Sequence, residues 1–199
     1  MLRAALLAPL AALTLALPAQ AEKISIDALN RYINGLGSAR SEFTQINADG
    51  SVLTGKLYIK RPGRARFEYD PPERSLVMAG GGQVAIFDAK SNQPPEQYPL
   101  ARTPLNLILK DRVNLGAARM VVGHAEVDGT TRIVAQDPEH PEYGTIELVF
   151  TPDPVQLRQW VITDDLGGQT TVILGDLQAG EDFPPSMFNI TTETAKRQR

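Results

Sequence analysis

Hydrophobic and polar side chains alternate along most of this chain, in short runs that turn residues separate. The first half contains five such runs, at residues 41–46, 52–60, 64–69, 76–78 and 84–87. The second half contains five more, at residues 119–122, 131–136, 145–151, 157–163 and 169–174. Successive side chains of a β-strand point to opposite faces of the sheet, so each run predicts a strand with one buried face.

Near the start of the chain, residues 25–36 follow a helical spacing instead. Their apolar side chains recur every three or four positions, at Ile26, Leu29, Ile33 and Leu36. Ser25 is a suitable N-cap for this helix, and Gly37 is a suitable residue to end it. The pattern predicts an amphipathic helix with one apolar face.

A second helical segment interrupts the strands at residues 103–110. Thr103 is a candidate N-cap, and Pro104 suits the first helical position. About ten or eleven short strands with two helices predict a mainly β protein built on one long antiparallel sheet. A twisted sheet of that length tends to curl toward a barrel.

The first 21 residues are expected to be a cleaved signal peptide. Residues 1–3 supply a positive charge, residues 4–17 form an apolar run, and Ala19-Gln20-Ala21 has the A-x-A form of a cleavage site. The apolar run is short for a bilayer span. Residues 22–199 are then expected to form one exported domain, which is long enough to bury a hydrophobic core.

Charge and cysteine content narrow the choice of partners. Removing 21 of 199 residues leaves 178, and because the removed segment carries only Arg3, these hold 19 basic and 23 acidic residues, a net charge of −4. This balance argues against a nucleic-acid partner. The absence of cysteine excludes disulfides and lipid attachment at cysteine. Arg64 and Arg66 are expected to form an ordinary exposed strand face or part of a docking surface.

Residues suited to catalysis or metal binding are few. The chain has two histidines, His124 and His140, no cysteine nucleophile, and no Gly-x-Ser-x-Gly or Ser-x-x-Lys motif. Residues 137–142 gather acidic and histidine side chains, but their prolines favour a solvated turn over a metal site. The glycines at 80–82 precede a strand, which favours a turn over a phosphate-binding loop. We therefore expect a binding protein, with no enzymatic activity, metal or cofactor.

One basic residue lies on the unexpected face of its strand. Leu57 and Ile59 share one face, and counting by twos places Arg61 on the same side. A guanidinium has five donors and keeps its proton, so above an apolar surface it must find acceptors. Either Arg61 ends the strand and reaches water, or it bonds to a segment that covers the apolar face.

These residues belong to a pattern that resembles the LolA family, the periplasmic carriers of outer-membrane lipoproteins. The strongest part of the resemblance is Gly55-x-Leu57-x-Ile59-Lys60-Arg61-Pro62 followed by Arg66-Phe67-x-Tyr69-x-x-Pro72. Further matches are Phe43-Thr44-Gln45, the glycines at 80–82 with Phe87-Asp88, and Thr103-Pro104-Leu105. The resemblance extends over residues 24–188 and is most specific in the first half of the chain.

The resemblance implies an unclosed antiparallel β-barrel with a helical lid, as in LolA and LolB. The lid is expected to contain the N-terminal helix and the helix inserted midway. The arginine of the Arg-Pro pair projects inward in the family and hydrogen-bonds to the lid backbone, which keeps the lid shut in the absence of cargo. Arg61 occupies that position, so the resemblance implies that it is a lid latch.

Two sets of apolar residues are expected to surround the cargo, although either set could instead fill a packed core. The wall of the acyl-chain cavity is expected to contain Phe43, Leu57, Ile59, Ala65, Phe67 and Tyr69. The underside of the lid is expected to contain Leu29, Ile33, Leu36, Leu105, Ile108 and Leu109.

The resemblance implies a monomeric periplasmic carrier that shields the acyl chains of lipoproteins. Its implied partners are an inner-membrane ABC transporter that releases lipoproteins and, where one exists, a LolB-like receptor at the outer membrane. Two alternatives remain at this point. One is a carrier or sensor of envelope lipid or glycolipid on the same fold, and the other is an enzyme that acts on envelope lipid or glycan.

Overall fold

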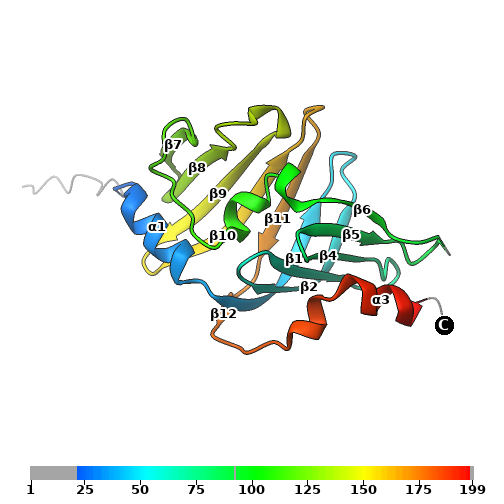
Figure 1. Cartoon of the computed structure of the whole chain (residues 1–199). Coiled ribbons are helices and arrows are strands. Elements are labelled where there is room, and N and C mark those ends of the chain that lie inside the picture. The colour runs from blue at the N-terminus through cyan, green and yellow to red at the C-terminus, as the bar shows by residue number, and fades with distance from the viewer. Residues whose placement is uncertain (1–21, 92, 198–199) are drawn as a thin grey trace, which may run out of the picture.

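The computed structural model describes residues 22–91 and 93–197 of the chain. The expected signal peptide, residues 1–21, therefore lies outside the described residues. Among the residues that are described, no helix has the length and apolar character needed to cross a membrane. The described chain forms a strongly curved sheet with α1 at one end and α3 on its outer side (Figure 1).

The sheet has twelve strands, and every ladder in it is antiparallel. The first-half strands are β1 (Ser38–Ile46), β2 (Val52–Lys60), β3 (Arg64–Tyr69), β4 (Leu76–Gly80), β5 (Gln83–Phe87) and β6 (Glu96–Pro99). The second-half strands are β7 (Val121–Val127), β8 (Thr130–Gln136), β9 (Thr145–Pro152), β10 (Val155–Thr163), β11 (Gln169–Leu174) and β12 (Gln178–Ala179).

The order of the strands leaves the barrel open. It runs β6-β5-β4-β3-β2-β1-β11-β10-β9-β8-β7, with β12 added beside β1. The edges are therefore β6 and β7, and within the described residues no ladder joins them. The prediction of an unclosed, mainly β architecture is confirmed, and β6 and β12 are additions that the alternating pattern did not mark.

The helical segments are short. They are α1 (Ile26–Gly35), η1 (Leu100–Arg102), α2 (Asn106–Leu109), η2 (Pro141–Tyr143), η3 (Pro185–Phe188) and α3 (Ile190–Arg197). The Ser25 hydroxyl accepts a hydrogen bond from the Ala28 N–H at 3.3 Å, so Ser25 caps α1 as predicted. At the other end of α1 the C-cap is Leu36, one residue before the predicted Gly37.

Two local predictions were wrong. Thr103 does not cap α2, because its hydroxyl donates to the Leu100 carbonyl at 2.9 Å and the helix begins only at Asn106. The run predicted at residues 119–122 is displaced, because Arg119 has a φ of 62° and β7 begins at Val121. A left-handed residue breaks the extended backbone that a strand requires.

The main core fills the concave side of the sheet and extends beneath α1 and α2. It joins Leu57 and Ile59 of the first half to Phe150 and Trp160 of the second half, with Leu29 of α1 packed among them. Leu29, Leu57 and Phe150 have no exposed surface. Burying such side chains contributes about 1.5–3 kcal/mol each. The lid helices are therefore part of the folded core, not an appendage to it.

The backbone of β3 and the ring of Phe43 approach Gly55 of β2 closely. A Cβ atom at this position would lie 2.1 Å from the Glu68 carbonyl oxygen and 2.9 Å from the Phe43 ring. Such distances are impossible for a side chain, so only glycine fits here. The space left by glycine lets Phe43 meet Tyr69 across β2, with ring centroids 5.2 Å apart.

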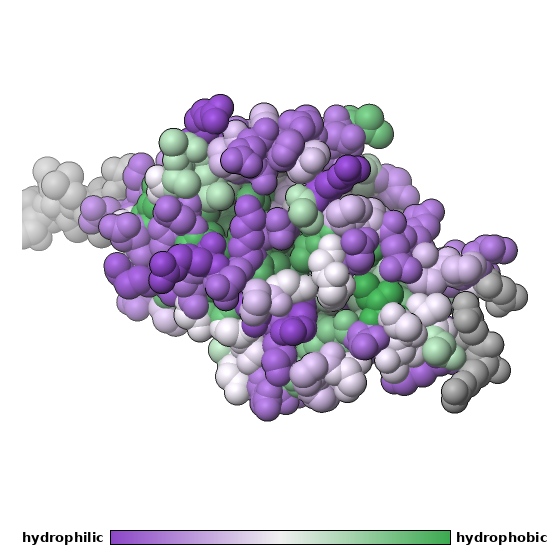
Figure 2. Space-filling view, in the orientation of Figure 1, coloured by the Kyte–Doolittle hydropathy of each residue, from purple (hydrophilic) through white to green (hydrophobic). Residues whose placement is uncertain are grey.

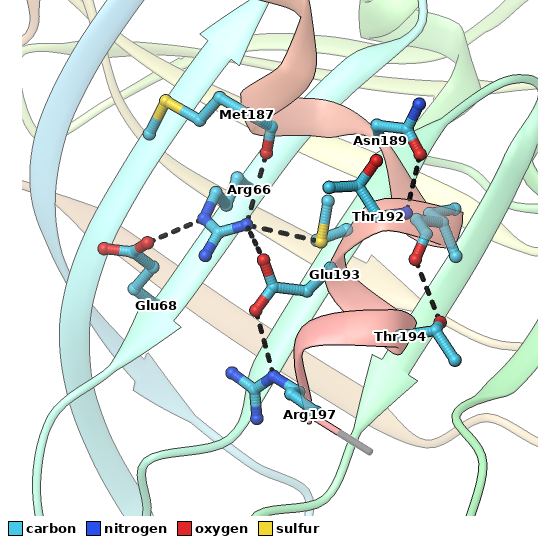
Figure 3. A network of polar contacts seen from close by, with 10 residues as sticks. Arg66, Glu68, Met187, Asn189, Thr192, Glu193, Thr194 and Arg197 are labelled. Carbon is cyan, nitrogen blue, oxygen red and sulfur yellow. Dashed lines mark hydrogen bonds and ion pairs between the residues drawn. The ribbon is translucent and has the colours of Figure 1, made fainter. Parts of the chain in front are cut away.

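The outer face of β3–β5 is covered by the C-terminal segment, which corrects the prediction for Arg66. Its guanidinium lies between Glu68, at 2.6 Å, and Glu193 of α3, at 3.2 Å (Figure 3). The Arg66 side chain is 13% exposed. Beneath α3, Ile190 packs on a second apolar cluster that includes Met78 and Phe87. Arg66 is thus a half-buried attachment point for the C-terminal segment, not part of an ordinary exposed strand face.

Candidate functional site

Arg61 lies directly after β2, where that strand passes the end of the N-terminal helix. Its backbone N–H donates to the Gly37 carbonyl at 2.7 Å. Two residues later, the Gly63 N–H donates to the carbonyl of Leu109, the last residue of α2, at 2.8 Å. The β2–β3 turn is therefore attached through its backbone to the ends of both lid helices.

The Arg61 guanidinium bonds to the C-terminal ends of both lid helices. Nη1 donates to the Ile33 carbonyl, and Nη2 donates to the Lys110 carbonyl. Longer contacts of 3.4 Å join Nη2 to the Asn34 side-chain oxygen and to the Asp111 carbonyl. The last carbonyls of a helix carry its negative dipole end and have few partners within the helix; the Ile33 carbonyl accepts only the cap N–H of Leu36, at 3.2 Å, among the backbone groups described. A cation with several donors satisfies both requirements at once.

Burial and charge oppose each other at Arg61. Burial lowers the pKa of its guanidinium, and the negative charge of Asp111 partly offsets this effect. The side chain remains protonated, because arginine does not lose its proton in proteins. Within the described part of the chain, its buried Nε has no hydrogen-bond partner. Arg61 is therefore a half-buried charge with one donor unsatisfied.

Two asparagines of α1 tie the two parts of the lid together. The Asn34 side-chain amide donates to the Val113 carbonyl at 2.8 Å, and its oxygen accepts from the Val113 N–H at 2.9 Å. One turn earlier, the Asn30 side chain accepts from the Leu115 N–H at 2.8 Å. Sequence reasoning did not single out either residue. Their i,i+4 spacing on the helix was the only available signal.

The start of α1 is held by residues of β7 and β8. The Ile24 N–H donates to the Thr131 hydroxyl at 2.8 Å, and its carbonyl lies 2.9 Å from His124 Nε2. Thr131 is 2% exposed. These two bonds hold the start of α1, and the bonds from Arg61 hold its other end.

The six expected wall residues all belong to the main core or pack against it. Four of them are buried in the main core and do not line the cavity described below: Phe43, Leu57, Ile59 and Ala65. Phe67 and Tyr69 line that cavity. Most of the predicted wall is therefore packed core in this structure, in one cluster with Leu29 of α1 and Leu109 of α2.

The expected lid residues are divided in a similar way. Leu29, Ile33, Ile108 and Leu109 are buried in the main core. Leu105 is half-buried and borders the open cavity. Leu36 is the exception, because it is the half-buried C-cap of α1 and does not belong to the main core.

The open cavity lies where the core reaches the surface between the two halves of the sheet. Its volume is about 720 Å³, within the range of about 300–1,000 Å³ that is usual for ligand pockets. Its apolar lining comes from both halves of the chain: Phe67, Val77, Val84, Ile86, Tyr98, Leu105, Trp160, Ile162 and Val172. Figure 2 shows apolar residues in green, visible between polar ones near the middle of this face.

Trp160 and Ile162 were missed because a bulge changes the face of β10. Leu157 pairs with Phe150, yet Gln159 pairs with the next residue back, Val149, so Arg158 is an extra residue. Beyond it, Trp160 and Ile162 point toward the cavity. Counting by twos from Leu157 places them on the opposite face, because a bulge shifts the alternation by one.

The segments considered for metal or phosphate binding form turns. His140 pairs with Glu142 at 2.9 Å and stacks on Tyr143 with ring centroids 4.7 Å apart. In the ranges that the structure describes, no group of three or more acidic, histidine or cysteine side chains is placed to hold a metal ion. Gly81 and Gly82 have φ values of 58° and 78° and form the tight turn between β4 and β5.

Comparison with known proteins places this arrangement in a family. The family model described as "Outer membrane lipoprotein carrier protein LolA" matches residues 34–191, from the last turn of α1 to the first turn of α3. A relative from Azotobacter vinelandii, called an outer-membrane lipoprotein carrier protein, is 24% identical over 181 residues, covering 86% of each chain. One of the same name from Methylococcus capsulatus is 23% identical over 180 residues, also covering 86% of each chain.

Among solved structures, a LolA superfamily protein from Nitrosomonas europaea is similar over 83% of this chain and 98% of its own, at 10% identity and a TM-score of 0.45. The family model covers the last turn of α1, α2, Arg61 and all twelve strands of the described sheet. The chain belongs to the LolA family of outer membrane lipoprotein carrier proteins.

Proposed function

We propose that this protein carries acylated lipoproteins through the periplasm and shields their acyl chains from water on the way. The observation that carries the proposal is a mainly apolar cavity of about 720 Å³ beside the core. The helices α1 and α2 cover that core, and Arg61 bonds to the C-terminal ends of both. Membership of the LolA family supports the same function.

The physical need for such a carrier is large. Each CH₂ group of an acyl chain contributes about 0.8 kcal/mol to its preference for an apolar environment. A lipoprotein with several long chains is therefore trapped in its membrane unless a protein replaces the lipid contact. Apolar residues such as Phe67, Trp160 and Ile162 offer that contact without a membrane.

In this proposal the lid opens to enlarge the binding site. The cavity already reaches Leu105 beside α2, and the buried residues Leu57 and Ile59 lie in the same core. Moving α1 and α2 away from the sheet exposes those residues to incoming acyl chains. The chains then take the place of Leu29, Ile33 and Leu109, while Arg61 loses its carbonyl partners. Closing of the lid competes with cargo and so favours release.

The partners follow from this cycle. We propose that an inner-membrane ABC transporter supplies the lipoprotein and that the outer membrane receives it, through a LolB-like receptor where one is present. The carrier acts as a monomer and as a binding protein without catalysis, cofactor or nucleic acid. Residues 22–199 form its single domain, after removal of residues 1–21.

The test is a release assay with purified protein. Residues 22–199 are added to inner-membrane vesicles that contain the transporter, labelled lipoprotein and ATP. The expected result is a soluble complex of one carrier and one lipoprotein that depends on ATP. If phospholipid or glycolipid is extracted and lipoprotein stays in the vesicles, the proposal is wrong and a lipid carrier on the same fold replaces it.

A further inference from the structure

A series of hydrogen-bonded polar side chains connects the β1–β2 hairpin to the wall of the cavity. The Tyr69 hydroxyl donates to Gln45 Oε1 at 2.7 Å, and Gln45 Nε2 donates to Asn47 Oδ1 at 2.6 Å. Asn47 then donates to the Ser51 hydroxyl at 2.9 Å, and that hydroxyl donates to the Asp49 carboxylate at 2.6 Å. Four successive hydrogen bonds therefore all donate in one direction, away from the cavity.

Asp49 sets this direction. An ionised carboxylate only accepts hydrogen bonds, so the Ser51 hydroxyl must donate to it and each earlier member must donate onward. The bond from the Ser51 side chain lowers the pKa of Asp49, which keeps this carboxylate ionised. Hydrogen bonds in such a series also polarise one another. The Tyr69 proton is consequently directed to Gln45.

The oxygen of Tyr69 is left with an acceptor function facing the cavity. Burial raises the pKa of Tyr69 to about 12, so its hydroxyl keeps its proton. Both Tyr69 and Gln45 line the cavity, beside apolar residues that include Phe67, Val77 and Trp160. The ring of Tyr69 is held edge to face on Phe43, with ring centroids 5.2 Å apart, so the position of the oxygen is well defined.

The cavity lining also includes charged side chains, among them Arg102, Glu142 and Asp164. On the apolar part of the wall beside Phe67, Val77 and Trp160, a fixed acceptor favours a ligand that brings a donor. An ester-linked acyl chain offers only ester oxygens, which accept hydrogen bonds and cannot donate one to the Tyr69 oxygen. An N-acylated cysteine differs, because the amide that joins its third chain carries an N–H. A buried N–H without a partner costs free energy, so matching it to a waiting acceptor favours the amide-bearing ligand.

We infer that the Tyr69 oxygen accepts a hydrogen bond from the amide N–H of the N-acylated cysteine at the start of a triacylated lipoprotein. The inference rests on the proposed carrier function and names the chemical group that the carrier recognises besides the acyl chains. Two amides of the cargo have this chemistry, the N-acyl amide and the first peptide bond. The experiment below separates them.

The test uses three synthetic lipopeptides with the same acyl chains and the same short peptide. One has the natural N-acyl amide, the second is N-methylated at that amide, and the third is N-methylated at the first peptide bond. Each competes with an apolar fluorescent probe for the carrier, which is the wild type, Tyr69→Phe, Gln45→Leu or Tyr98→Phe. Tyr98 is a matched control, because it presents a ring and a hydroxyl to the same cavity from β6.

The wild type is expected to bind the natural lipopeptide about 2- to 12-fold more tightly than the N-acyl-methylated one, as one net hydrogen bond predicts. Tyr69→Phe should lose this preference and still bind the apolar probe. Gln45→Leu should weaken the preference, since the Tyr69 proton is then free to turn toward the cavity. Tyr98→Phe should keep the preference in full.

Several outcomes would overturn the inference while leaving the carrier function intact. They are equal binding of all three lipopeptides by the wild type, the same loss in Tyr98→Phe as in Tyr69→Phe, or a preference that responds only to methylation of the first peptide bond. Failure of the wild type to bind any of the three lipopeptides would instead contradict the proposed function. A drop in thermal stability without a change in the preference would show that Tyr69 is only a structural residue.

Discussion

Replacing Arg61 with leucine tests the latch directly. The change removes two good hydrogen bonds, to the Ile33 and Lys110 carbonyls, and two longer contacts. Two bonds from a charged donor contribute about 3–6 kcal/mol to closure. Removing the buried and unpaired Nε returns about 1–3 kcal/mol, so with the central values, about 4.5 less about 2, closure should weaken by about 2.5 kcal/mol. This corresponds to a rise of about 70-fold in the ratio of open to closed lid.

Two measurements follow from this change. Affinity for an apolar probe should rise in Arg61→Leu, because less of the binding free energy is used to open the lid. Transfer of bound lipoprotein to acceptor outer membranes should slow, because closing no longer competes with the cargo. Arg61→Lys should lie between, since an ammonium lacks the planar fork of the guanidinium.

Arg64→Leu is the control for the loss of a nearby positive charge. Arg64 begins β3 on the far side of the turn and lies in a groove beside α3, away from the lid. It should match the wild type in both assays. If Arg61→Leu also matches the wild type in probe affinity and in transfer, Arg61 is only a strand-end side chain and the latch is refuted.

Three further changes separate packing, lid coupling and the C-terminal attachment. Ile59→Glu should fail to fold at room temperature by circular dichroism, because Ile59 is 3% exposed, whereas Ile162→Glu at the cavity should stay folded and lose the apolar probe. Unfolding of both would contradict the open cavity. Asn34→Leu should lower the free energy of unfolding by about 1–3 kcal/mol, because the Val113 backbone loses both partners, and unchanged denaturant midpoints would argue against this link. Burial raises the pKa of Glu193, but bonds and charges from Arg197 and Arg66 outweigh it and lower the pKa overall. The stability from Glu193 is therefore present above its unfolded pKa and lost as pH falls through the folded one, so Glu193→Gln should flatten this acid-side loss of stability. Identical pH profiles would show that the attachment does not depend on this charge.

Part of the site could be predicted from local pattern alone. Alternation places Leu57 and Ile59 on the inner face of β2, and both are buried in the core. The same count places Arg61 on that side, and its guanidinium does reach the lid from there. Helical spacing and the Ser25 cap were enough to locate α1. These features follow from the fixed geometry of one strand or one helix, which repeats every two or every 3.6 residues.

The cavity and the partners of the polar groups were decided only by the tertiary structure. The bulge at Arg158 turns Trp160 and Ile162 toward the cavity, and the alternation of residues in β10 does not predict this bulge. The alternation of β3 predicts an exposed Arg66, which is half-buried because α3, far along the chain, packs over it. The carbonyl of Lys110 and the side chain of Asn34 reach Arg61 through the folding of three separate segments. A period reports which way a side chain points relative to its neighbours in sequence. What that side chain meets depends on which distant segments the whole chain brings against it.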